Sequence, residues 1–280
     1  MPVHDDLGTR MKEFYEGVPK TRLVRRMPVA IRIDGKAFHT FTRGFMKPFD
    51  KILMQSMQET AKYLCENIQG CVFGYTQSDE ITLILVDYQK LNSSAWFDYE
   101  VQKLCSISAS MATVAFNKIF VSKATEFIQN CAYMNYSDGI YGPGTPEYEA
   151  CEAYDKAIQK GAMFDARCFN IPKEEVCNLI YWRQLDAMRN SVQMVGQANF
   201  SHKELQNKSC NMIKEMLLDQ KDIDWDDYPV VCQRGAAIVK SKVALIPAHC
   251  ETAWIIDTNM PILKGEDRRY IDDLIYVGEE

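Results

Sequence analysis

Three acidic side chains are the clearest candidates for chemistry in this sequence. Asp34 directly follows an apolar, β-branched run, and Asp79 and Glu80 lie between two further runs of that kind. If these runs form neighbouring strands, the strand end and the turn meet at one sheet edge. Carboxylates brought together there repel each other unless a cation binds, so the pattern suggests a divalent-metal site that also takes substrate phosphates. Solvated turn acids are the simpler alternative.

The residues around these acids favour phosphate chemistry. Gly35 follows Asp34 and permits close approach of the backbone. Metal-binding carboxylates, a glycine turn and clustered cations together suit phosphoryl or nucleotidyl transfer. The cations and hydrogen-bond donors nearby are Lys36, His39, Lys47 and Ser78. For His39, a helix-capping or partly buried role stays equally open.

Basic residues concentrate between residues 20 and 51. Nine basic and two acidic residues give this window a charge of +7 and leave −13 for the rest of a chain whose total is −6. The negative total argues against a nucleic-acid partner for the chain as a whole. The local excess indicates either a solvated basic face or an anion site for phosphates or a nucleic-acid backbone.

Composition narrows the class of protein. The chain has 280 residues, 47% hydrophobic and 25% charged, which excludes collagen-like and largely disordered proteins. No apolar run approaches the roughly 18 residues of a membrane span, so we expect no membrane partner. The N-terminal residues lack the regions of a secretory signal. Ten cysteines without a Cys-x-x-Cys pair favour reduced thiols in a cytoplasmic protein over disulfides or a zinc site.

Hydrophobic periodicity predicts the elements that position the acids. Residues 29–33 predict a strand that ends at Asp34 and Gly35, and residues 71–75 with 81–86 predict a hairpin. A helix should open at Pro48, because five apolar residues share one helical face: Leu53, Met57, Ala61, Leu64 and Ile68. The later expected elements are a helix from 99 to about 124, a strand over 163–171, mainly helix from 173 to 218 and an extended stretch over 234–247.

This order of elements is the split-βαβ pattern. It predicts an α+β fold with a ferredoxin-like antiparallel sheet, helices on one face of it, and a mainly helical C-terminal part. A glycine- and proline-rich cluster at 137–146 suggests a palm-like catalytic domain at 1–136 and a C-terminal domain at 137–280. The strand near 163–171 should return to the first domain's sheet. The fold alone assigns no function.

Several segments together resemble the tRNA-histidine guanylyltransferase family. The most specific are Asp34-Gly35-Lys36-Ala37-Phe38-His39 and Gln77-Ser78-Asp79-Glu80, and similarity continues at 47–50, 164–167 and 181–186. Members of that family and their guanylyltransferase-like relatives add nucleotides to tRNA 5′ ends in the 3′-to-5′ direction. The similarity extends from about residue 25 to about residue 245.

The resemblance implies a polymerase-like palm that uses two Mg²⁺ ions. Asp34 and Asp79 would bind the ions, the Gly35 carbonyl would complete one of them, and Glu80 would support the acidic site as a third catalytic residue. Lys47 and Asp50 stand where the family handles a second triphosphate. The nucleotide-binding residues implied are Asp34, Gly35, Lys36, Ala37, Phe38, His39, Lys47, Asp50, Ser78, Asp79 and Lys103.

The chain departs from the family pattern in two places. After Trp96 and Phe97 the family tends to be basic, whereas acidic residues precede Lys103 here. Members that act on histidine tRNA carry His-Ile-Asn-Asn where residues 188–191 of this chain read Met-Arg-Asn-Ser. Methionine cannot replace the hydrogen bonds of histidine, while Arg189 could hold a phosphate. The change indicates a guanylyltransferase-like protein or, alternatively, a differently packed helix.

The activity implied is Mg²⁺-dependent nucleotidyl transfer to tRNA 5′ ends. ATP would activate a 5′-monophosphate, and the 3′-hydroxyl of GTP or another nucleoside triphosphate would then displace AMP. We expect template-dependent repair of truncated tRNAs. The alternatives are a guanylyltransferase specific for histidine tRNA, a palm-type nucleotidyl cyclase and a non-catalytic tRNA-binding module. The expected partners are tRNA, nucleoside triphosphates and further copies of the chain in a homotetramer, a dimer of dimers.

Overall fold

One antiparallel sheet organises the chain. The computed structural model describes residues 6–138, 142–246 and 249–278. Within them, six strands lie in the order β4-β1-β3-β2-β5-β6, and every neighbouring pair is antiparallel. The strands are β1 (Val29–Gly35), β2 (Cys71–Gln77), β3 (Glu80–Leu85), β4 (Phe164–Asn170), β5 (Ala236–Ile246) and β6 (His249–Asp257).

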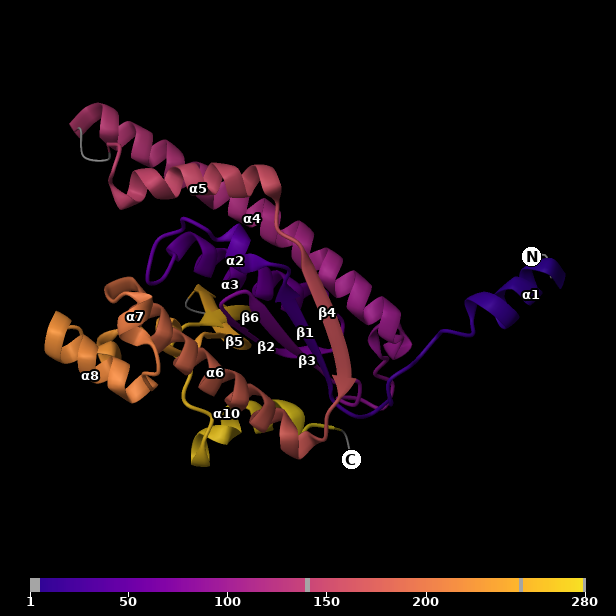
Figure 1. The fold of residues 1–280 in the computed structure, drawn as a ribbon. Coiled ribbons are helices and arrows are strands. Elements are labelled where there is room, and N and C mark those ends of the chain that lie inside the picture. The colour runs from indigo at the N-terminus through magenta and orange to yellow at the C-terminus, as the bar shows by residue number, and fades with distance from the viewer. Residues whose placement is uncertain (1–5, 139–141, 247–248, 279–280) are drawn as a thin grey trace.

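Helices surround this sheet and extend from it (Figure 1). The long helix α4 runs past β4 with α5 beside it, α6 and α10 lie on the opposite side of the sheet, and α1 projects away from the body. The helices are α1 (Asp6–Met11), α2 (Phe38–Phe41), α3 (Lys51–Asn67), α4 (Val101–Asp138), α5 (Pro146–Lys160), α6 (Lys173–Asn199), α7 (His202–Leu205), α8 (Cys210–Lys221), α9 (Val230–Arg234) and α10 (Arg269–Ile275).

The first four strands confirm the split-βαβ prediction. The chain runs β1, α3, β2, β3, α4 and β4, and β1 lies between β3 and β4 in the sheet. Ile31 at the centre of β1 is opposite Leu83 on β3 and opposite Cys168 on β4. The α+β class and the return of the later strand to the first sheet are therefore both confirmed.

The two faces of the sheet are covered by different parts of the chain. Successive side chains of a strand point to opposite faces, so Ile31 and Ile33 pack among α3 and α4 while Ala30 packs among residues of α6 and α10. The prediction of helices on one face holds for α3 and α4. The second face, where the sequence pattern placed no helix, is covered by the C-terminal helices.

Local interactions shift two helix boundaries from their predicted positions. The first long helix begins at Lys51 rather than at Pro48, because the Asp50 carboxylate accepts a hydrogen bond from the Leu53 amide at 2.9 Å and caps the helix. The second begins at Val101, after left-handed conformations that end at Tyr99. It continues past residue 124 to Asp138 because no glycine or proline interrupts it earlier.

Helix α4 also corrects the expectation about apolar runs. Its stretch Val101–Met134 is long and apolar enough to cross a membrane by length and composition. The helix nevertheless packs against α3, α5 and β4, and both Phe116 and Phe120 on it are buried in the core. Its apolar face therefore belongs to the interior of the fold.

The C-terminal residues contribute strands as well as helices. The extended stretch expected over 234–247 is β5, which pairs with β2, and β6 was not predicted. Strands from both sides of residue 137 thus share one sheet, and the division of the chain at residues 136 and 137 stays a prediction. Three predicted features lie wholly or partly outside the described residues: the signal-free start (1–5), the breaker cluster (139–141) and Pro247.

The cysteines whose side chains are described, nine in number, are free thiols. Cys105 on α4 and Cys168 on β4 approach to 3.6 Å between their Sγ atoms. Burial raises the pKa of Cys168 to about 12, which keeps this thiol protonated and poorly reactive at neutral pH. For these nine residues the expectation of free thiols agrees with the structure.

An aromatic cluster joins the first helices to the sheet edge that carries the acids. Phe116 on α4 lies fully buried, with its ring centroid 5.6 Å from Phe38 and 5.3 Å from Phe164. Phe38 stands just after β1, and Phe164 begins β4 opposite Gly35. The position of the segment after Asp34 therefore depends on this packing.

Replacing Phe116 with alanine should lower the free energy of unfolding by about 3–5 kcal/mol, because the cavity left among rigid rings cannot close. Urea denaturation measures the change. Val114→Ala, an exposed position on the same helix, is the control and should stay within about 0.5 kcal/mol of the parent protein. A loss below about 1 kcal/mol for Phe116→Ala would show that the cluster does not hold the core together.

Candidate functional site

The hairpin turn brings Asp79 against the end of β1. The Gly35 amide donates a 3.0 Å hydrogen bond to the Asp79 carbonyl oxygen. Asp34 lies opposite Glu80 on β3 and opposite Asp165 on β4. The strand end and the hairpin turn therefore meet at one sheet edge, as the strand pattern predicted, and they bring several carboxylates together.

Burial and mutual repulsion raise the pKa values of the central acids. Burial raises the pKa of Asp34 most, and the nearby charges of Asp79 and Glu80 raise it further. Burial also raises the pKa of Asp79, although a hydrogen bond from the Ser78 hydroxyl at 2.9 Å and the neighbouring His39 lower it in part. Ionisation of each acid therefore costs more free energy in the folded protein than in water, and a bound cation would offset this cost.

The donor set suits a magnesium ion that also binds phosphate. Mg²⁺ takes one or two carboxylates and completes its shell with water and substrate phosphates. The described residues include no cluster of three or more His, Cys, Asp and Glu side chains arranged as a metal site. Asp34, Asp79 and the Gly35 carbonyl could hold a cation together with water and substrate phosphates.

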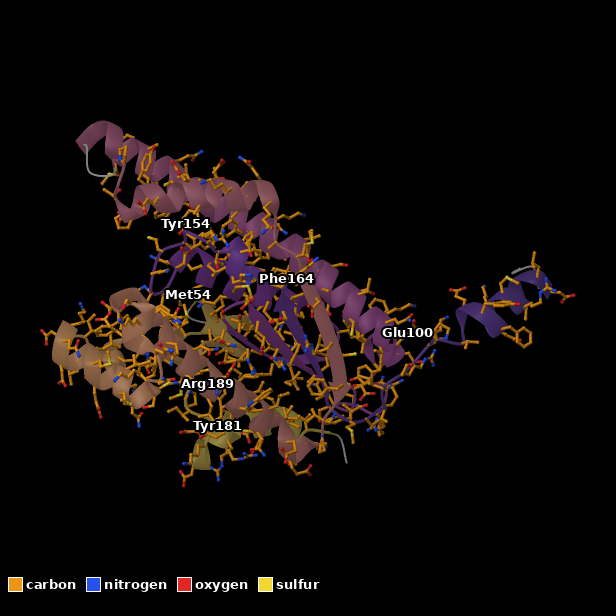
Figure 2. All side chains as sticks on the ribbon, in the orientation of Figure 1. Met54, Glu100, Tyr154, Phe164, Tyr181 and Arg189 are labelled. Atoms are coloured by element: carbon orange, nitrogen blue, oxygen red, sulfur yellow. The ribbon has the colours of Figure 1, made fainter. Side chains whose placement is uncertain are left out.

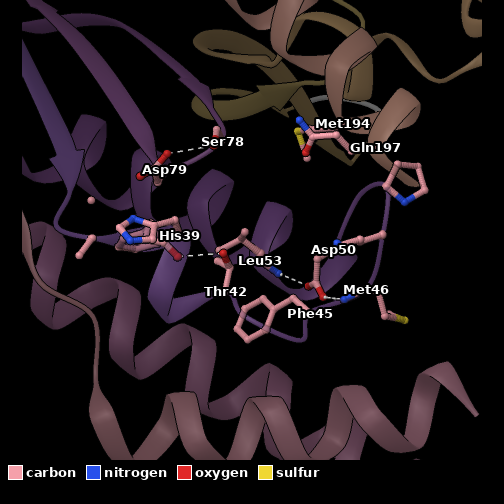
Figure 3. Close-up of a pocket in the computed structure, with 15 residues that line it drawn as sticks. His39, Thr42, Phe45, Met46, Asp50, Leu53, Ser78, Asp79, Met194 and Gln197 are labelled. Carbon is pink, nitrogen blue, oxygen red and sulfur yellow. Dashed lines mark hydrogen bonds between the residues drawn. The ribbon is translucent and has the colours of Figure 1, made fainter. Parts of the chain in front are cut away.

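A cavity of about 500 Å³ opens beside the acids (Figure 3). Segments far apart in the sequence form its walls: the turn after β1, the approach to α3, the hairpin turn and the C-terminal end of α6. Its volume is in the range of small-molecule sites. The lining residues are Gly35, Ala37, Phe38, His39, Thr42, Phe45, Met46, Lys47, Pro48, Asp50, Leu53, Ser78, Asp79, Met194 and Gln197. No motif or periodicity in the sequence pointed to Met194 or Gln197 as site residues.

Glu80 is held by two arginines. Its Oε2 accepts from Arg32 at 2.6 Å, and its Oε1 accepts from Arg183 of α6 at 2.7 Å. Arg183 also binds Asp186, which in turn binds Arg189. Both carboxylate oxygens of Glu80 are thus hydrogen-bonded, so Glu80 can hold β3 in place next to the acids. Its catalytic role stays a prediction, and the quoted segment 181–186 was the one sequence signal for Arg183.

Asp50 is buried and caps α3. Its carboxylate accepts from the Leu53 and Met46 amides at 2.9 Å each and from the Tyr154 hydroxyl at 2.6 Å. These bonds orient Asp50 at the wall of the cavity, where Figure 3 shows Asp50. Lys47 also lines the cavity. Its predicted contact with a nucleotide stays a prediction, and Tyr154 was missed because 104 residues separate the partners.

Three predicted nucleotide-binding residues have other surroundings in this chain. The Phe38 ring is 4% exposed and packs in the aromatic cluster, touching the cavity only as part of its wall. Lys36 is exposed and does not line the cavity. Lys103 lies near Glu100 at the start of α4. This part of α4 contacts β4 toward the strand end that is far from Gly35. Their nucleotide-binding roles stay predictions.

The stretch 188–191 is built into α6 and its neighbours. Met188 packs against the cluster that includes Val192, and the buried Ser191 hydroxyl accepts from Trp225 Nε1 at 3.0 Å. Arg189 is 65% exposed in its side chain and binds Asp186. Asn190 lines a smaller pocket next to the main cavity. Two of the four residues therefore serve the packing of the C-terminal helices.

Comparison with known proteins gives concordant matches. Residues 8–172 match the family model described as tRNAHis guanylyltransferase. A solved bacterial tRNA(His) guanylyltransferase-like protein in complex with ATP is 36% identical, with a TM-score of 0.76 over 97% of this chain and 100% of its own. A bacterial tRNA(His) guanylyltransferase-like protein solved in complex with GTP is 34% identical, with a TM-score of 0.70 over 98% of this chain and 100% of its own. The tRNA(His) guanylyltransferase of Saccharomyces cerevisiae is 22% identical over 76% of this chain and 82% of its own.

Removing either central charge should stabilise the metal-free protein. Folding raises the pKa of both carboxyl groups, so the ionised acids weaken stability increasingly as pH rises through their folded-state pKa values. Asp34→Asn and Asp79→Asn should therefore raise Tm at pH 7 in chelator, and the gain should shrink as the pH falls toward about 4.

Thermal unfolding across this pH range measures the effect. Asp219→Asn, an exposed acid on α8, should leave Tm unchanged at every pH. Lower Tm values for both central variants at pH 7 would contradict the electrostatic account of the site.

Proposed function

The chain belongs to the tRNAHis guanylyltransferase family, whose members are nucleotidyltransferases, and we propose that it repairs the 5′ ends of tRNA in a magnesium-dependent, template-directed reaction. One observation carries the proposal. Asp34 and Asp79 form no ion pair with any described residue, and they meet beside a cavity of nucleotide size. This arrangement suits transfer of a nucleotide to a phosphate, in which positioning and charge neutralisation supply most of the catalysis.

The cavity is the proposed nucleotide site. Lys47 and His39 line it and would face the negative triphosphate, while Gly35 and Ala37 give the phosphates access to the backbone. Ala37 has a left-handed conformation with φ of 52°, which shapes this turn. Relatives solved in complex with ATP and with GTP support the choice of nucleoside triphosphates.

The acids are the proposed metal ligands. Asp34, Asp79 and the Gly35 carbonyl would hold two Mg²⁺ ions together with phosphate oxygens. When bound, these ions would lower the pKa of the attacking hydroxyl and stabilise charge on the leaving group. Glu80, fixed by Arg32 and Arg183, would keep the hairpin turn and β1 in place during the reaction.

The chemistry proceeds in two proposed steps. The 5′-monophosphate of the RNA attacks the α-phosphate of ATP and releases pyrophosphate, which leaves an adenylylated end. The 3′-hydroxyl of the incoming nucleotide then attacks the activated 5′-phosphate and expels AMP. A 5′-triphosphate end would react without the first step. His39 and Lys47 would orient the nucleotide and screen its charge in both steps.

The sequence of α6 supports repair over recognition of histidine tRNA. Where histidine-specific members carry histidine, this chain has Met188, which packs against its own helical cluster. Where they carry the second asparagine, Ser191 accepts a hydrogen bond from Trp225. Watson–Crick pairing with the opposite strand would then select the nucleotide. The Arg189 side chain would contact RNA without reading its sequence.

We further propose a homotetramer, arranged as a dimer of dimers, as the active form. The charge of −13 outside residues 20–51 leaves one subunit little positive surface for tRNA. RNA bound across subunits would contact residues 20–51 of more than one copy of the chain. A monomeric mass under assay conditions, with full activity, would contradict this assembly.

The decisive assay supplies labelled nucleotides and a panel of tRNAs. Substrates lacking their first 5′ nucleotide should be extended with the complementary base, with little preference for histidine tRNA. Asp34→Ala and Asp79→Ala should lower both adenylylation and extension by at least 10³-fold, because each removes a metal ligand. Lys47→Ala should weaken them by a smaller factor.

Each alternative function has its own outcome in this assay. Addition of a non-templated G to histidine tRNA alone would refute repair. A cyclic nucleotide as the product would show a cyclase, and tRNA binding without any product would show a binding module. Circular dichroism of the two alanine variants confirms that lost turnover does not reflect lost structure.

A further inference from the structure

Trp182 on α6 is an exposed tryptophan beside the acidic site. It is 52% exposed, whereas the other three tryptophans of the chain, Trp96, Trp225 and Trp254, are at most 9% exposed. Figure 2 shows the side chains of this helix, with Tyr181 and Arg189 labelled on it. Leaving so large an indole surface in water costs free energy that packing elsewhere would recover.

Two guanidinium groups hold the Trp182 ring in place. The Arg183 guanidinium carbon is 4.6 Å from the ring centroid, and that of Arg32 is 5.5 Å from it. Both arginines are in turn fixed by Glu80, at 2.7 and 2.6 Å. The ring therefore has little freedom to turn away, and its exposed surface keeps a defined orientation.

The ring lies on the side of Asp34 away from the nucleotide cavity. Arg32, Asp34 and Gly35 come in this order along β1. The Trp182 ring lies over Arg32, whereas Gly35 lines the cavity. Side chains two apart in a strand share a face and are about 7 Å apart. Met194, where α6 reaches the cavity, is about 18 Å farther along the helix.

Exposed arginines flank the ring. Arg167 on β4 is directly opposite Arg32, and its side chain is 60% exposed. Arg189 is two helical turns beyond Trp182 and 65% exposed. Arg167 contacts the exposed carboxylate of Asp165, and Arg189 contacts Asp186, whose side chain is 19% exposed. A guanidinium group has five N–H donors, so each arginine keeps further donors free for a phosphate. An aromatic platform with flanking guanidinium groups is the surface that stacks bases and tracks phosphates in single-stranded RNA.

We propose that Trp182 stacks against the base of the 5′-terminal nucleotide of the RNA substrate. Arg167 and Arg189 bind phosphates next to it. The acids then lie between the two reactants, with the nucleotide in the cavity on one side and the RNA end on the other. This inference rests on the proposed function, because it supplies the binding site for the RNA end on which that function acts.

Tryptophan fluorescence tests the stacking directly. The probe is a 5′-monophosphorylated acceptor-stem RNA hairpin that lacks its first nucleotide, without metal or nucleotide, so no turnover occurs. It should quench the wild-type fluorescence, whereas Trp182→Phe, which keeps only the three buried tryptophans, should show no quenching. The same RNA in circular form has no 5′ end and should not quench. Equal quenching by circular RNA or by free GTP would overturn the proposal.

Steady-state kinetics tests the contribution to substrate binding. Trp182→Ala and Trp182→Leu should raise KM for the RNA by roughly 5- to 100-fold, with KM for GTP unchanged. Trp182→Phe should restore most of the affinity, because a phenyl ring also stacks. Leu185→Ala, at a 45% exposed position of the same helix, is the matched control and should behave as wild type.

The outcomes separate the two proposals. An active wild type with unaltered RNA KM in Trp182→Leu would refute the stacking site alone. An equal loss in Trp182→Leu and Trp182→Phe would also refute it, since the ring would then serve only to pack the arginines. Wild-type protein that is quenched by the RNA end yet adds no nucleotide would support the stacking site and refute the proposed function.

Discussion

The ion pairs between Glu80 and two arginines are the interaction on which the site depends. Arg32 comes from β1, Glu80 from β3 and Arg183 from α6, so three separate parts of the chain meet in one buried contact. A buried carboxylate without such partners would be strongly unfavourable. Here both of its oxygens are satisfied. Asp34 at the end of β1 and Asp79 in the hairpin turn form no ion pair within the described part of the chain, so their charge is available for a cation.

The same contact sets the position of α6, and with it the shape of the cavity. Arg183 binds near the middle of the helix, and one side of the cavity is closed farther along by Met194 and Gln197. Toward the start of the helix, Trp182 lies over the two arginines. The N-terminal strands therefore supply the acids, while α6 supplies one wall of the cavity and the surface beyond it.

Local patterns predicted much of this structure. The alternation in residues 29–33 and the two runs around Ser78 located β1 and the hairpin, and adjacency of strands in a split-βαβ sheet was enough to bring Asp34 and Asp79 together. The contacts that local patterns could not supply are long-range. The Arg183–Glu80 pair spans 103 residues, and the Asp50–Tyr154 bond spans 104. No periodicity within a window of 20 residues carries information about such pairs.

The differences between the sequence predictions and the structure have identifiable physical causes. Pro48 suggested a helix start, but the Asp50 side chain fixes the start at Lys51 by capping it. The motif grouped Lys103 with the nucleotide-binding residues. In the structure it lies near the start of α4, toward the end of β4 that is far from Gly35, and its nucleotide-binding role stays a prediction. β6 was missed because its pairing with β5 is a tertiary choice that its composition does not force.

Thermal unfolding in the presence of GTP and increasing Mg²⁺ tests whether Asp34 and Asp79 together form a cation site. A ligand that binds only the folded protein raises Tm with its concentration. We expect the Tm of the wild type to rise with Mg²⁺ and EDTA to reverse the rise. Asp34→Asn and Asp79→Asn should both lose this rise, while Asp219→Asn should retain it. An equal rise in all four proteins would contradict the claim that the uncompensated acid pair is the cation site.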